Sequence, residues 1–471
     1  MASLPQRRMA TRRARLSRWL VALAGVGLAL GLVISGPARS LEQVGAPAPV
    51  HSAVGAVGST ASRPPEASHE PSPSAASPST APPSGAPGPR AASPTAPVAS
   101  ARPPRTSDRF ATPEIRGALQ ARLDDLRERY AIPGISVTII LPDGTRWVGS
   151  SGLADVKAGR EVTPTTKFAV GSVSKTFTAA LIMALEEGGK VALDATVPTY
   201  LPELAIDPAI TVRQLLDHTS GLNDFFFHRR IDKALLSSPA RRWDPAESLT
   251  YVGKPYFKPG RGWHYSNTNY LVLGMLAERA GGAPLSDQLH ERFLGPLGLT
   301  ETSYQPSDEP ADPLAHGYRF DSPGRTARPI DLSDGSGIAP FTSVVTAAAG
   351  AGGIASNSQD LAVWTRQLYG GHVLEPGSIR AMILDAASTA RFRPRLPYGL
   401  GVQLIDFAGE PSLGHTGRLL GFRSLIRHLP RSGMSIAVLT NQSRTDPGIV
   451  GRSLMAIALG SIRRCPCPEP R

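Results

Sequence analysis

The segment GSVSKT, residues 171–176, places a lysine three residues after Ser172. The chain has 50 basic residues, and only seven of them are lysines. Arginine stays protonated in proteins, whereas a desolvated lysine can lose its proton and act as a base. Lys175 could therefore accept the proton of the Ser172 hydroxyl and make that serine a nucleophile, which no arginine could do.

The residues that follow predict a helix that brings this pair together. The stretch SVSKTFTAALIMALEEGG has helical composition and ends at Gly188 and Gly189, so Ser172 would lie at the helix N-terminus. The helix dipole and the free N–H groups favour negative charge there, and positions i and i+3 share one face. A serine and a lysine at this spacing also occur by chance roughly once in such a chain, so the pair needs supporting motifs.

Tyr265, Ser266 and Asn267 form the second motif, just before an apolar stretch with helical character. A phenol beside a lysine-activated serine can share or relay protons. The amide of Asn267 could bind a substrate carbonyl, or it could hold the lysine in place. Taken alone, the motif is equally well explained by a packed tyrosine and an asparagine that caps a helix.

His415, Thr416 and Gly417 form the third motif, within LGHTGRLLGFRS. Gly417 would let a backbone or a ligand approach a strand closely. Thr416 offers a hydroxyl, and His415 could supply a positive charge or a hydrogen-bond donor. A single histidine without such neighbours is more often a structural residue whose hydrogen bonds are satisfied.

Taken in this order, the three motifs resemble those of the penicillin-recognising serine hydrolases, the family of class C β-lactamases, D-alanyl-D-alanine carboxypeptidases and related esterases and D-amino-acid peptidases. The resemblance covers about residues 112–460 and includes the stretches ITVRQLLDHTSGL and GAGGIASNSQDLAVW. It implies that Ser172 forms an acyl-enzyme, that Lys175 is its base, and that Tyr265 assists acylation and deacylation.

The resemblance also implies which groups bind the substrate, without a cofactor or a metal ion. Asn267 would bind the substrate amide, and the oxyanion hole would consist of the backbone N–H groups of Ser172 and Arg418. The strand at the edge of the site would carry His415, Thr416 and Gly417.

Two departures from the family pattern leave the substrate open. His415 stands where β-lactamases usually have lysine, and the triplet is closer to that of the exocellular carboxypeptidases. Those carboxypeptidases have an arginine just after the YGLG stretch that holds the terminal carboxylate of the substrate, whereas here Gln403 follows Val402. Arg418 or Arg423 could supply the missing cation.

The predicted elements indicate how these residues are positioned. Residues 113–130 show helical spacing, and GISVTIILPDGTRWVGSSG predicts two strands joined by a turn. Near the other end, YGLGVQLIDF, GFRSLIRHL and GMSIAVLTN predict strands, and a closing helix follows them. Residues 172–395 are mostly helices and long loops, among them SNSQDLAVWTRQLYGG with a capped start and a glycine stop. We therefore expect an α+β fold, with an antiparallel sheet formed by both chain ends, flanked by helices, and an inserted mostly helical domain, as in the β-lactamase and transpeptidase family.

The two ends of the chain differ from this domain. In residues 1–40, six arginines precede the apolar run 19–34, which predicts a cleaved signal peptide or a membrane anchor. Residues 41–108 predict a disordered linker rich in Pro, Ala and Ser. The hydrolase domain would span 109–462, and 463–471 would be a disordered tail that contains Cys465 and Cys467. The expected location is extracytoplasmic, secreted or anchored to the membrane by the N-terminal segment.

Composition excludes several other classes. The first 108 residues carry 11 basic and 4 acidic residues, whereas the remaining 363 carry 39 and 34, so the later part lacks the basic cluster that nucleic acid would require. No G-x-S-x-G, H-E-x-x-H or cysteine cluster indicates an α/β-hydrolase or a metal site. Asp217, His218 and Ser220 are too close in sequence for a catalytic triad and predict a structural turn. The run Phe225 to Phe227 could line an acyl-group pocket or belong to the core.

The sequence therefore predicts an exported serine hydrolase that forms an acyl-enzyme on Ser172 and acts on D-alanyl peptides or β-lactams. The alternatives are a promiscuous carboxylesterase of the same family and a β-lactam- or wall-binding receptor without turnover. The expected partners are a small peptide, β-lactam or ester substrate and cell-wall peptidoglycan.

Overall fold

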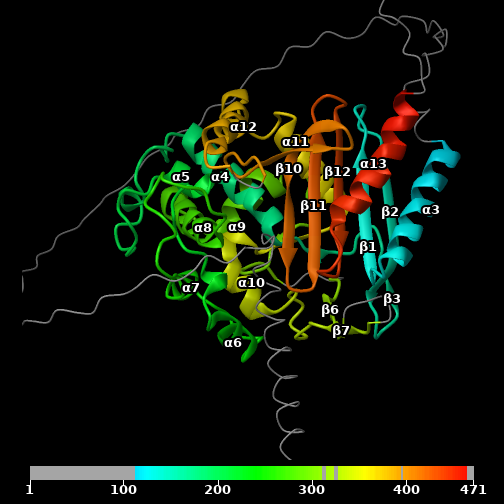
Figure 1. Ribbon diagram of the computed structural model, residues 1–471, viewed down its shortest axis with the longest axis horizontal. Coiled ribbons are helices and arrows are strands. Elements are labelled where there is room, and N and C mark those ends of the chain that lie inside the picture. Colours follow the sequence, from blue (N-terminus) through cyan, green and yellow to red (C-terminus); the bar gives the residue numbers. More distant parts are fainter. Residues whose placement is uncertain (1–111, 310–313, 323–326, 394–395, 464–471) are drawn as a thin grey trace, which may run out of the picture. The chain divides into compact units, whose positions relative to one another are not determined.

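The computed structural model describes residues 112–463, apart from 310–313, 323–326 and 394–395 (Figure 1). The predicted N-terminal segment, the predicted linker and the tail with its two cysteines lie outside these residues and stay predictions. The helices of the described part include none that is long and apolar enough to cross a membrane.

A seven-stranded antiparallel sheet joins the two ends of the described chain. Its strand order is β3-β2-β1-β12-β11-β10-β9, and β1 pairs with β12 so that Val137 lies opposite Val438. The predicted α+β fold, with a sheet formed by both chain ends, is confirmed. The strands are β1 (Gly134–Ile140), β2 (Arg146–Asp155), β3 (Arg160–Glu161), β9 (Gln403–Phe407), β10 (Glu410–Leu419), β11 (Phe422–Leu429) and β12 (Met434–Thr440).

Helices cover both faces of this sheet. On one face, α3 (Pro113–Arg129) and α13 (Pro447–Arg463) lie side by side (Figure 1). The leucines of α3 at helical spacing pack there against Val438 and its neighbours. On the other face, α11 (Ser358–Tyr369) contacts β1 and β12. Both central strands are consequently buried along their whole length, which suits their Val- and Ile-rich sequences.

The region between β3 and β9 is mostly helical, as predicted, and includes five short strands. Its central helix is α4 (Ser174–Glu187), of whose 14 residues 11 are buried. The remaining helices are α5 (Val212–Leu216), α6 (Ile231–Leu236), α7 (Pro245–Leu249), α8 (Asn267–Gly281), α9 (Leu285–Leu289), α10 (Thr342–Ala348) and α12 (Pro376–Ala390). The short helical turns are η1 (Gly171–Val173), η2 (Val197–Thr199), η3 (Phe225–Phe227), η4 (His290–Leu294) and η5 (Ala349–Ala351), and the short strands are β4 (Phe168–Ala169), β5 (Ser303–Tyr304), β6 (Tyr318–Phe320), β7 (Pro329–Asp331) and β8 (Ile354–Ser356).

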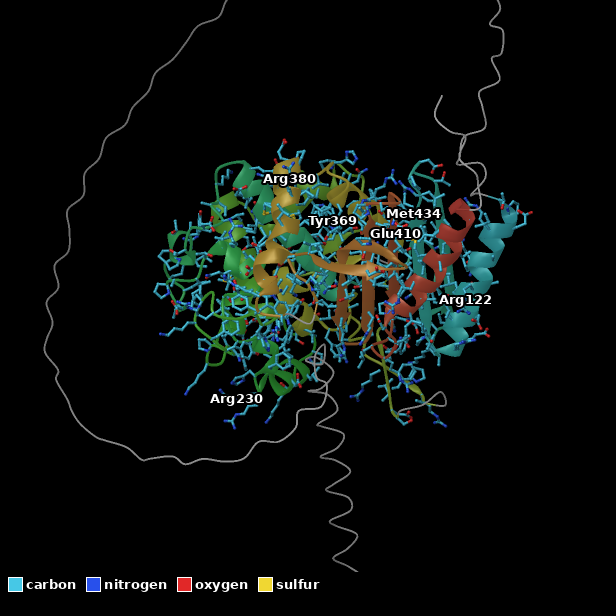
Figure 2. All side chains as sticks on the ribbon, turned by 45° about the horizontal axis from the view of Figure 1, so that its top comes forward. Arg122, Arg230, Tyr369, Arg380, Glu410 and Met434 are labelled. Atoms are coloured by element: carbon cyan, nitrogen blue, oxygen red, sulfur yellow. The ribbon has the colours of Figure 1, made fainter. Side chains whose placement is uncertain are left out.

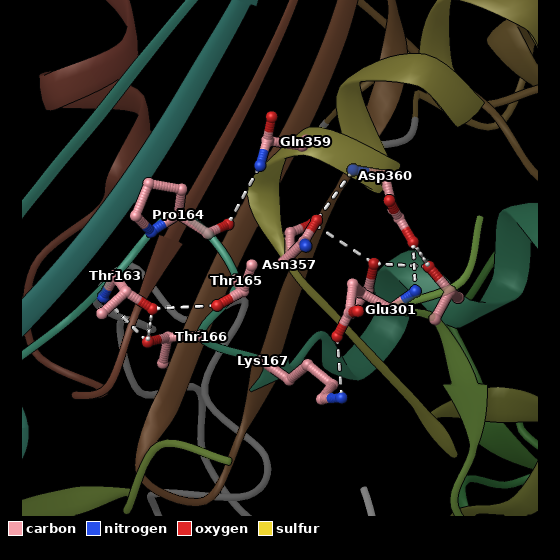
Figure 3. Close-up of polar contacts among 11 residues, drawn as sticks. Thr163, Pro164, Thr165, Thr166, Lys167, Glu301, Asn357, Gln359 and Asp360 are labelled. Carbon is pink, nitrogen blue, oxygen red and sulfur yellow. Dashed lines mark hydrogen bonds and ion pairs between the residues drawn. The ribbon is translucent and has the colours of Figure 1, made fainter. Parts of the chain in front are cut away.

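The helix α11 has the predicted cap and stop. The side-chain oxygen of Asn357 accepts a hydrogen bond from the backbone N–H of Asp360 at 2.8 Å (Figure 3). The carboxylate of Asp360 accepts one from the backbone N–H of Glu301 at 2.9 Å, and Glu301 pairs with Lys167 at 2.9 Å. Gly370 ends the helix. The first turn of α11 is therefore also tied to Glu301 through Asp360.

Charged side chains lie mostly outside this core. Arg230 and Arg380 are exposed on the inserted region, whereas Glu410 and Met434 are buried at the sheet (Figure 2). Burying a charge is costly unless a partner compensates it. The buried charged groups of the described chain, which include Lys175, therefore need an explanation.

We expect Trp364→Ala to lower the free energy of unfolding by about 3–5 kcal/mol, because it leaves a cavity in the core. The fully buried ring of Trp364 stacks on Phe177, with the centroids 4.0 Å apart, and its Nε1 donates to Thr176 Oγ1 at 2.9 Å. Urea denaturation measures the change. Leu384→Ala, at a position that is 62% exposed, is the control and should cost less than about 0.5 kcal/mol. Equal losses for the two variants would contradict the prediction.

Candidate active site

Ser172 lies in a tight turn just before the helix. Gly171–Val173 form η1, and α4 begins at Ser174, two residues later than predicted. The reason is Gly171, whose φ of +52° is a left-handed conformation that favours glycine. A Cβ atom at this position would also lie 2.8 Å from the backbone C and O atoms of Arg418. Gly171 therefore bends the chain and brings the turn against β10.

A second glycine makes room for this contact on the β10 side. A Cβ atom at Gly417 would lie 2.0 Å from the carbonyl oxygen of Val170. The hydroxyl of Ser424, in β11, donates to the same oxygen at 2.6 Å. The close approach predicted at Gly417 is present, and η1 meets the strand backbone to backbone.

Lys175 is fully buried beside Ser172. Its Nζ lies 3.2 Å from Ser172 Oγ, 2.7 Å from Asn267 Oδ1 and 2.7 Å from the carbonyl oxygen of Ala351. A neutral amine has two N–H groups and one lone pair. The Asn267 and Ala351 oxygens take the two N–H groups, which leaves the lone pair for the hydroxyl proton of Ser172.

The protonation of Lys175 follows from its surroundings. Burial lowers the pKa of Lys175 to about 7, and the nearby carboxyl of Asp224 opposes this shift. A large share of the lysine is therefore neutral near neutral pH, as a general base requires. This is the property that set Lys175 apart from the arginines of the chain.

Tyr265 lies next to this pair, with the centroid of its ring 5.1 Å from Lys175 Nζ. Burial raises the pKa of Tyr265 above its ordinary value, although the neighbouring Ser172 hydroxyl opposes the rise. The phenol therefore keeps its proton at neutral pH. Its buried hydroxyl oxygen has no hydrogen-bond partner among the described residues, so it is available to pass a proton to a bound group.

Asn267 begins α8 and connects two charged groups. Its Oδ1 accepts from Lys175, and its Nδ2 donates to Asp224 Oδ2 at 2.8 Å. Of the two roles that the sequence left open, holding the lysine is the one for which the structure provides contacts. Sequence reasoning missed Asp224, because a single aspartate 43 residues before Asn267 gives no local signal.

His415 is fully buried and has partners at both ring nitrogens. Its Nδ1 lies 2.6 Å from the carbonyl oxygen of Thr416, and its Nε2 lies 3.0 Å from the hydroxyl of Tyr398. A carbonyl only accepts, so Nδ1 carries the proton and Nε2 accepts from the tyrosine. Burial lowers the pKa of His415 to about 3. The ring is therefore neutral, so of the two roles left open for His415 the hydrogen-bond donor fits the structure and the positive charge does not.

The edge of β10 is open beyond Gly414. The strand β9 pairs with β10 only from Glu410 to Gly414, which lies opposite Gln403. The side-chain oxygen of Gln403 then accepts from the backbone N–H of Thr416 at 3.1 Å and from the guanidinium of Arg427 at 2.9 Å. The side chain of Gln403 thus extends the contact along β10 from Gly414 to Thr416.

The backbone of Arg418 is next along this open edge. Backbone N–H groups alternate in direction along a strand, so the N–H of Arg418 faces the same side as that of Thr416. The backbone of Arg418 also lies against Gly171, the neighbour of Ser172. The two groups predicted to form the oxyanion hole are therefore close in space.

The side chains of Arg418 and Arg423 lie elsewhere. The two residues are directly opposite on β10 and β11. Successive side chains of a strand alternate between faces, so both lie on the face opposite to Gly417 and the nucleophile turn. Burial, together with the charge of Arg423, lowers the pKa of Arg418 to about 10. Neither guanidinium is directed at Ser172.

His218 is a site neighbour that sequence reasoning assigned only to a turn. That turn exists, because Asp217 accepts hydrogen bonds from the backbone and hydroxyl of Thr219. The buried ring of His218, however, lies 4.3 Å from the ring of Tyr265, and its Nδ1 accepts from the backbone N–H of Ser266 at 3.2 Å. His218 therefore holds the second motif in place through its contacts with Tyr265 and Ser266.

Two of the three residues in the run Phe225 to Phe227 have the predicted core role, and the acyl-pocket role stays a prediction. Phe225 and Phe226 are buried and belong to the core, whereas Phe227 is 51% exposed. Phe227 is thus the member of the run that a ligand could contact directly.

One cluster within the described residues has donor atoms close enough to hold a cation. Asp155, His316 and Asp331 bring one donor each within 4.8 Å of the others. His316 Nδ1 lies 2.8 Å from Asp331 and 3.8 Å from Asp155. A histidine between two carboxylates accounts for this arrangement as an ion-pair network.

A family model described as Beta-lactamase matches residues 119–459. The chain belongs to the β-lactamase family. This confirms the resemblance seen in the three motifs, and it makes the protein a hydrolase with the serine β-lactamase fold.

Several members of this family are similar along most of their length. Penicillin-binding protein 4 of Amycolatopsis lactamdurans is 29% identical over 340 residues, which are 68% of this chain and 84% of the relative. A D-aminopeptidase of Cereibacter sphaeroides is 28% identical over 346 residues, 73% of this chain. The match covers 63% of that D-aminopeptidase, less than two thirds of its length.

Solved structures give the same result for the fold. The D-stereospecific amidohydrolase from Streptomyces sp. is 28% identical with a TM-score of 0.59, and the match covers 71% of this chain and 96% of that one. The D-amino acid amidase from Ochrobactrum anthropi SV3 has a TM-score of 0.61 over 74% of this chain and 99% of that one. At 24% identity, the second match shows the fold alone.

We expect Lys175→Arg to slow hydrolysis of p-nitrophenyl acetate by a factor of ~10²–10⁴, because an arginine stays protonated and cannot serve as the base. In the unchanged protein, the rate should fall as the pH drops through about 7, because protonation of Lys175 removes the lone pair. The control is Lys167→Arg, at a buried lysine that pairs with Glu301 (Figure 3). An active Lys175→Arg protein with an unchanged pH profile would rule out the lysine as base.

Proposed function

We propose that this protein is an exported serine hydrolase that forms an acyl-enzyme on Ser172 from small amides and peptides of D-amino acids, such as D-alanyl peptides, and from β-lactams. The observation that carries the proposal is the position of Lys175. Its two N–H groups are held by Asn267 and Ala351, and its nitrogen lies 3.2 Å from Ser172 Oγ. The names of the relatives, penicillin-binding protein, D-aminopeptidase and D-stereospecific amidohydrolase, support this substrate class.

The proposed reaction follows from the groups around Ser172. Lys175 takes the hydroxyl proton while Ser172 Oγ attacks the carbonyl carbon of the substrate. The backbone N–H groups of Ser172 and Arg418 stabilise the oxyanion. Tyr265 donates its proton to the leaving group and takes the proton of the Lys175 ammonium in exchange, so both groups regain their starting states while the acyl group remains on the serine. Water then attacks the ester by the reverse route and releases the acid.

The described groups at the open edge of β10 support neutral leaving groups. His415 is neutral there, and the buried guanidinium of Arg427 is bonded to Gln403. Gln403 is already bonded to Thr416, and the guanidiniums of Arg418 and Arg423 lie on the other face. We therefore propose amides and esters with a neutral leaving group ahead of peptides with a free terminal carboxylate.

A panel of five substrates tests this function. A D-amino acid amide, its L-enantiomer, a D-Ala-D-Ala peptide, a cephalosporin and a short-chain p-nitrophenyl ester are each incubated with the protein and with Ser172→Ala, and product formation and intact protein mass are recorded. We expect an acyl adduct on Ser172, turnover of the D-amide at least ~10-fold faster than of its L-enantiomer, and loss of both in Ser172→Ala.

The other outcomes identify the alternatives. A stable β-lactam adduct without turnover of any substrate would indicate a receptor. Turnover of the ester alone would indicate a carboxylesterase. If Ser172→Ala keeps the hydrolytic activity, the proposal fails.

We also propose that the protein acts outside the cytoplasm, near peptidoglycan. The support is the pattern of arginines and the apolar run 19–34 within residues 1–40. Fractionation of cells that express the full chain, and a chain without residues 1–40, would test this. Retention of the full chain in the cytoplasm would contradict it.

A further inference from the structure

Asp224 is a buried carboxyl that directly contacts the network of the base. It is 1% exposed and precedes η3, where its Oδ1 accepts from the backbone N–H of Phe226 at 3.1 Å. Its Oδ2 accepts from Asn267 Nδ2 at 2.8 Å. Both oxygens therefore serve as acceptors, which is the pattern of an ionised carboxylate.

This contact decides which way the amide of Asn267 faces. With Nδ2 on Asp224, Oδ1 must face the other way, and it lies 2.7 Å from Lys175 Nζ. The reversed amide would point N–H groups at the N–H groups of the lysine and its oxygen at a carboxylate. Asp224, Asn267, Lys175 and Ser172 therefore form one chain of contacts with a single favourable orientation.

The position of Asp224 relative to Asn267 is itself fixed. The hydroxyl of Thr268, the next residue of α8, accepts from the backbone N–H of Phe225 at 3.1 Å and donates to the carbonyl oxygen of Asn223 at 2.7 Å. The turn that carries Asp224 is thus attached to the first turn of α8 on both sides of the aspartate.

The charges around Lys175 leave Asp224 as its counter-charge. Two aromatic rings lie near Lys175 Nζ. The ring centroid of Tyr265, just before α8, is 5.1 Å away, and that of Tyr270, within α8, is 5.5 Å away. The histidines that face the lysine are His218, in the turn after α5, and His415, in β10. Both are neutral, because burial and Lys175 lower the pKa of each. Burial raises the pKa of Asp224, whereas its N–H donors and Lys175 oppose that rise.

We propose that Asp224 is a positioning residue that orients Asn267 toward Lys175 and supplies the counter-charge of the lysine's ammonium form. The inference rests on the proposed role of Lys175 as base. It goes beyond that role, because it states which group determines the pH at which the base becomes available.

The test is the titration of Lys175, measured without any substrate. The full chain is labelled with ε-¹³C lysine, which gives seven signals, and Lys175→Ala assigns the one of interest. We expect Asp224→Asn to lower the titration midpoint of Lys175 by ~0.5–1 pH unit, because loss of the negative charge disfavours the ammonium form. The acid limb of p-nitrophenyl acetate hydrolysis should move to lower pH by the same amount.

Two more variants keep this test decisive. Asp224→Ser keeps a capping oxygen for η3 and removes the charge, so it should lower the midpoint as Asp224→Asn does. If one of these two variants folds poorly, the other still provides the measurement. Asp224→Glu keeps the negative charge, so the titration midpoint of Lys175 should stay close to that of the unchanged protein. As a control, Asp360→Asn makes the same change in the first turn of α11, at a carboxyl that is bonded to Glu301 and Thr302 and not to the Lys175 network, and it should leave the midpoint unchanged.

The outcomes separate this inference from the proposed function. A midpoint that is unchanged in both Asp224→Asn and Asp224→Ser, with only the rate reduced, would overturn the inference and leave the acyl-enzyme intact. A shifted midpoint in a protein that hydrolyses none of the substrates would support the inference while the proposed function fails.

Discussion

The burial of Lys175 is the physical constraint on which the site depends. An ammonium group in the protein interior is costly, so burial favours the neutral amine and makes the lysine a base. The neutral amine still needs acceptors for its two N–H groups, and these come from Asn267 and Ala351. α4, α8 and η5 must therefore pack closely, and they do: a Cβ atom at Gly350 would lie 2.8 Å from the carbonyl oxygen of Tyr270. The core around α4 is thus also the support of the base.

The second requirement is a place where backbone groups can reach the substrate. The nucleophile turn meets β10 without side chains between them, because Gly171 and Gly417 stand at the two closest points. Beyond Gly414, no strand of the described residues pairs with the outer side of β10, and the side chain of Gln403 reaches only as far as Thr416. The sheet thereby presents the backbone of Arg418 next to Ser172, while α3 and α13 cover its other face.

The groups around the nucleophile are mostly neutral, although the chain is basic. His415 is bonded to Tyr398 and to the carbonyl oxygen of Thr416, and burial lowers its pKa, so its ring is neutral. Arg427, fully buried, donates to the side chain of Gln403 and not toward Ser172. Few fixed charges near Lys175 mean that one carboxyl, Asp224, has a large influence on its proton.

The sequence by itself determined the fold class, the end-to-end sheet and the three motifs, because hydrophobic period and residue spacing are local properties. Even the cap of α11 followed from its own residues. The start of α4, the charge of His415, the faces of Arg418 and Arg423, and the contacts of His218 and Asp224 were decided only by the tertiary structure. Each depends on contacts between segments that are far apart in the chain. Lys175 and Ala351, for example, are in contact although they are 176 residues apart. Spacing can place a lysine near a serine, but only burial by distant segments lowers its pKa enough to make it a base.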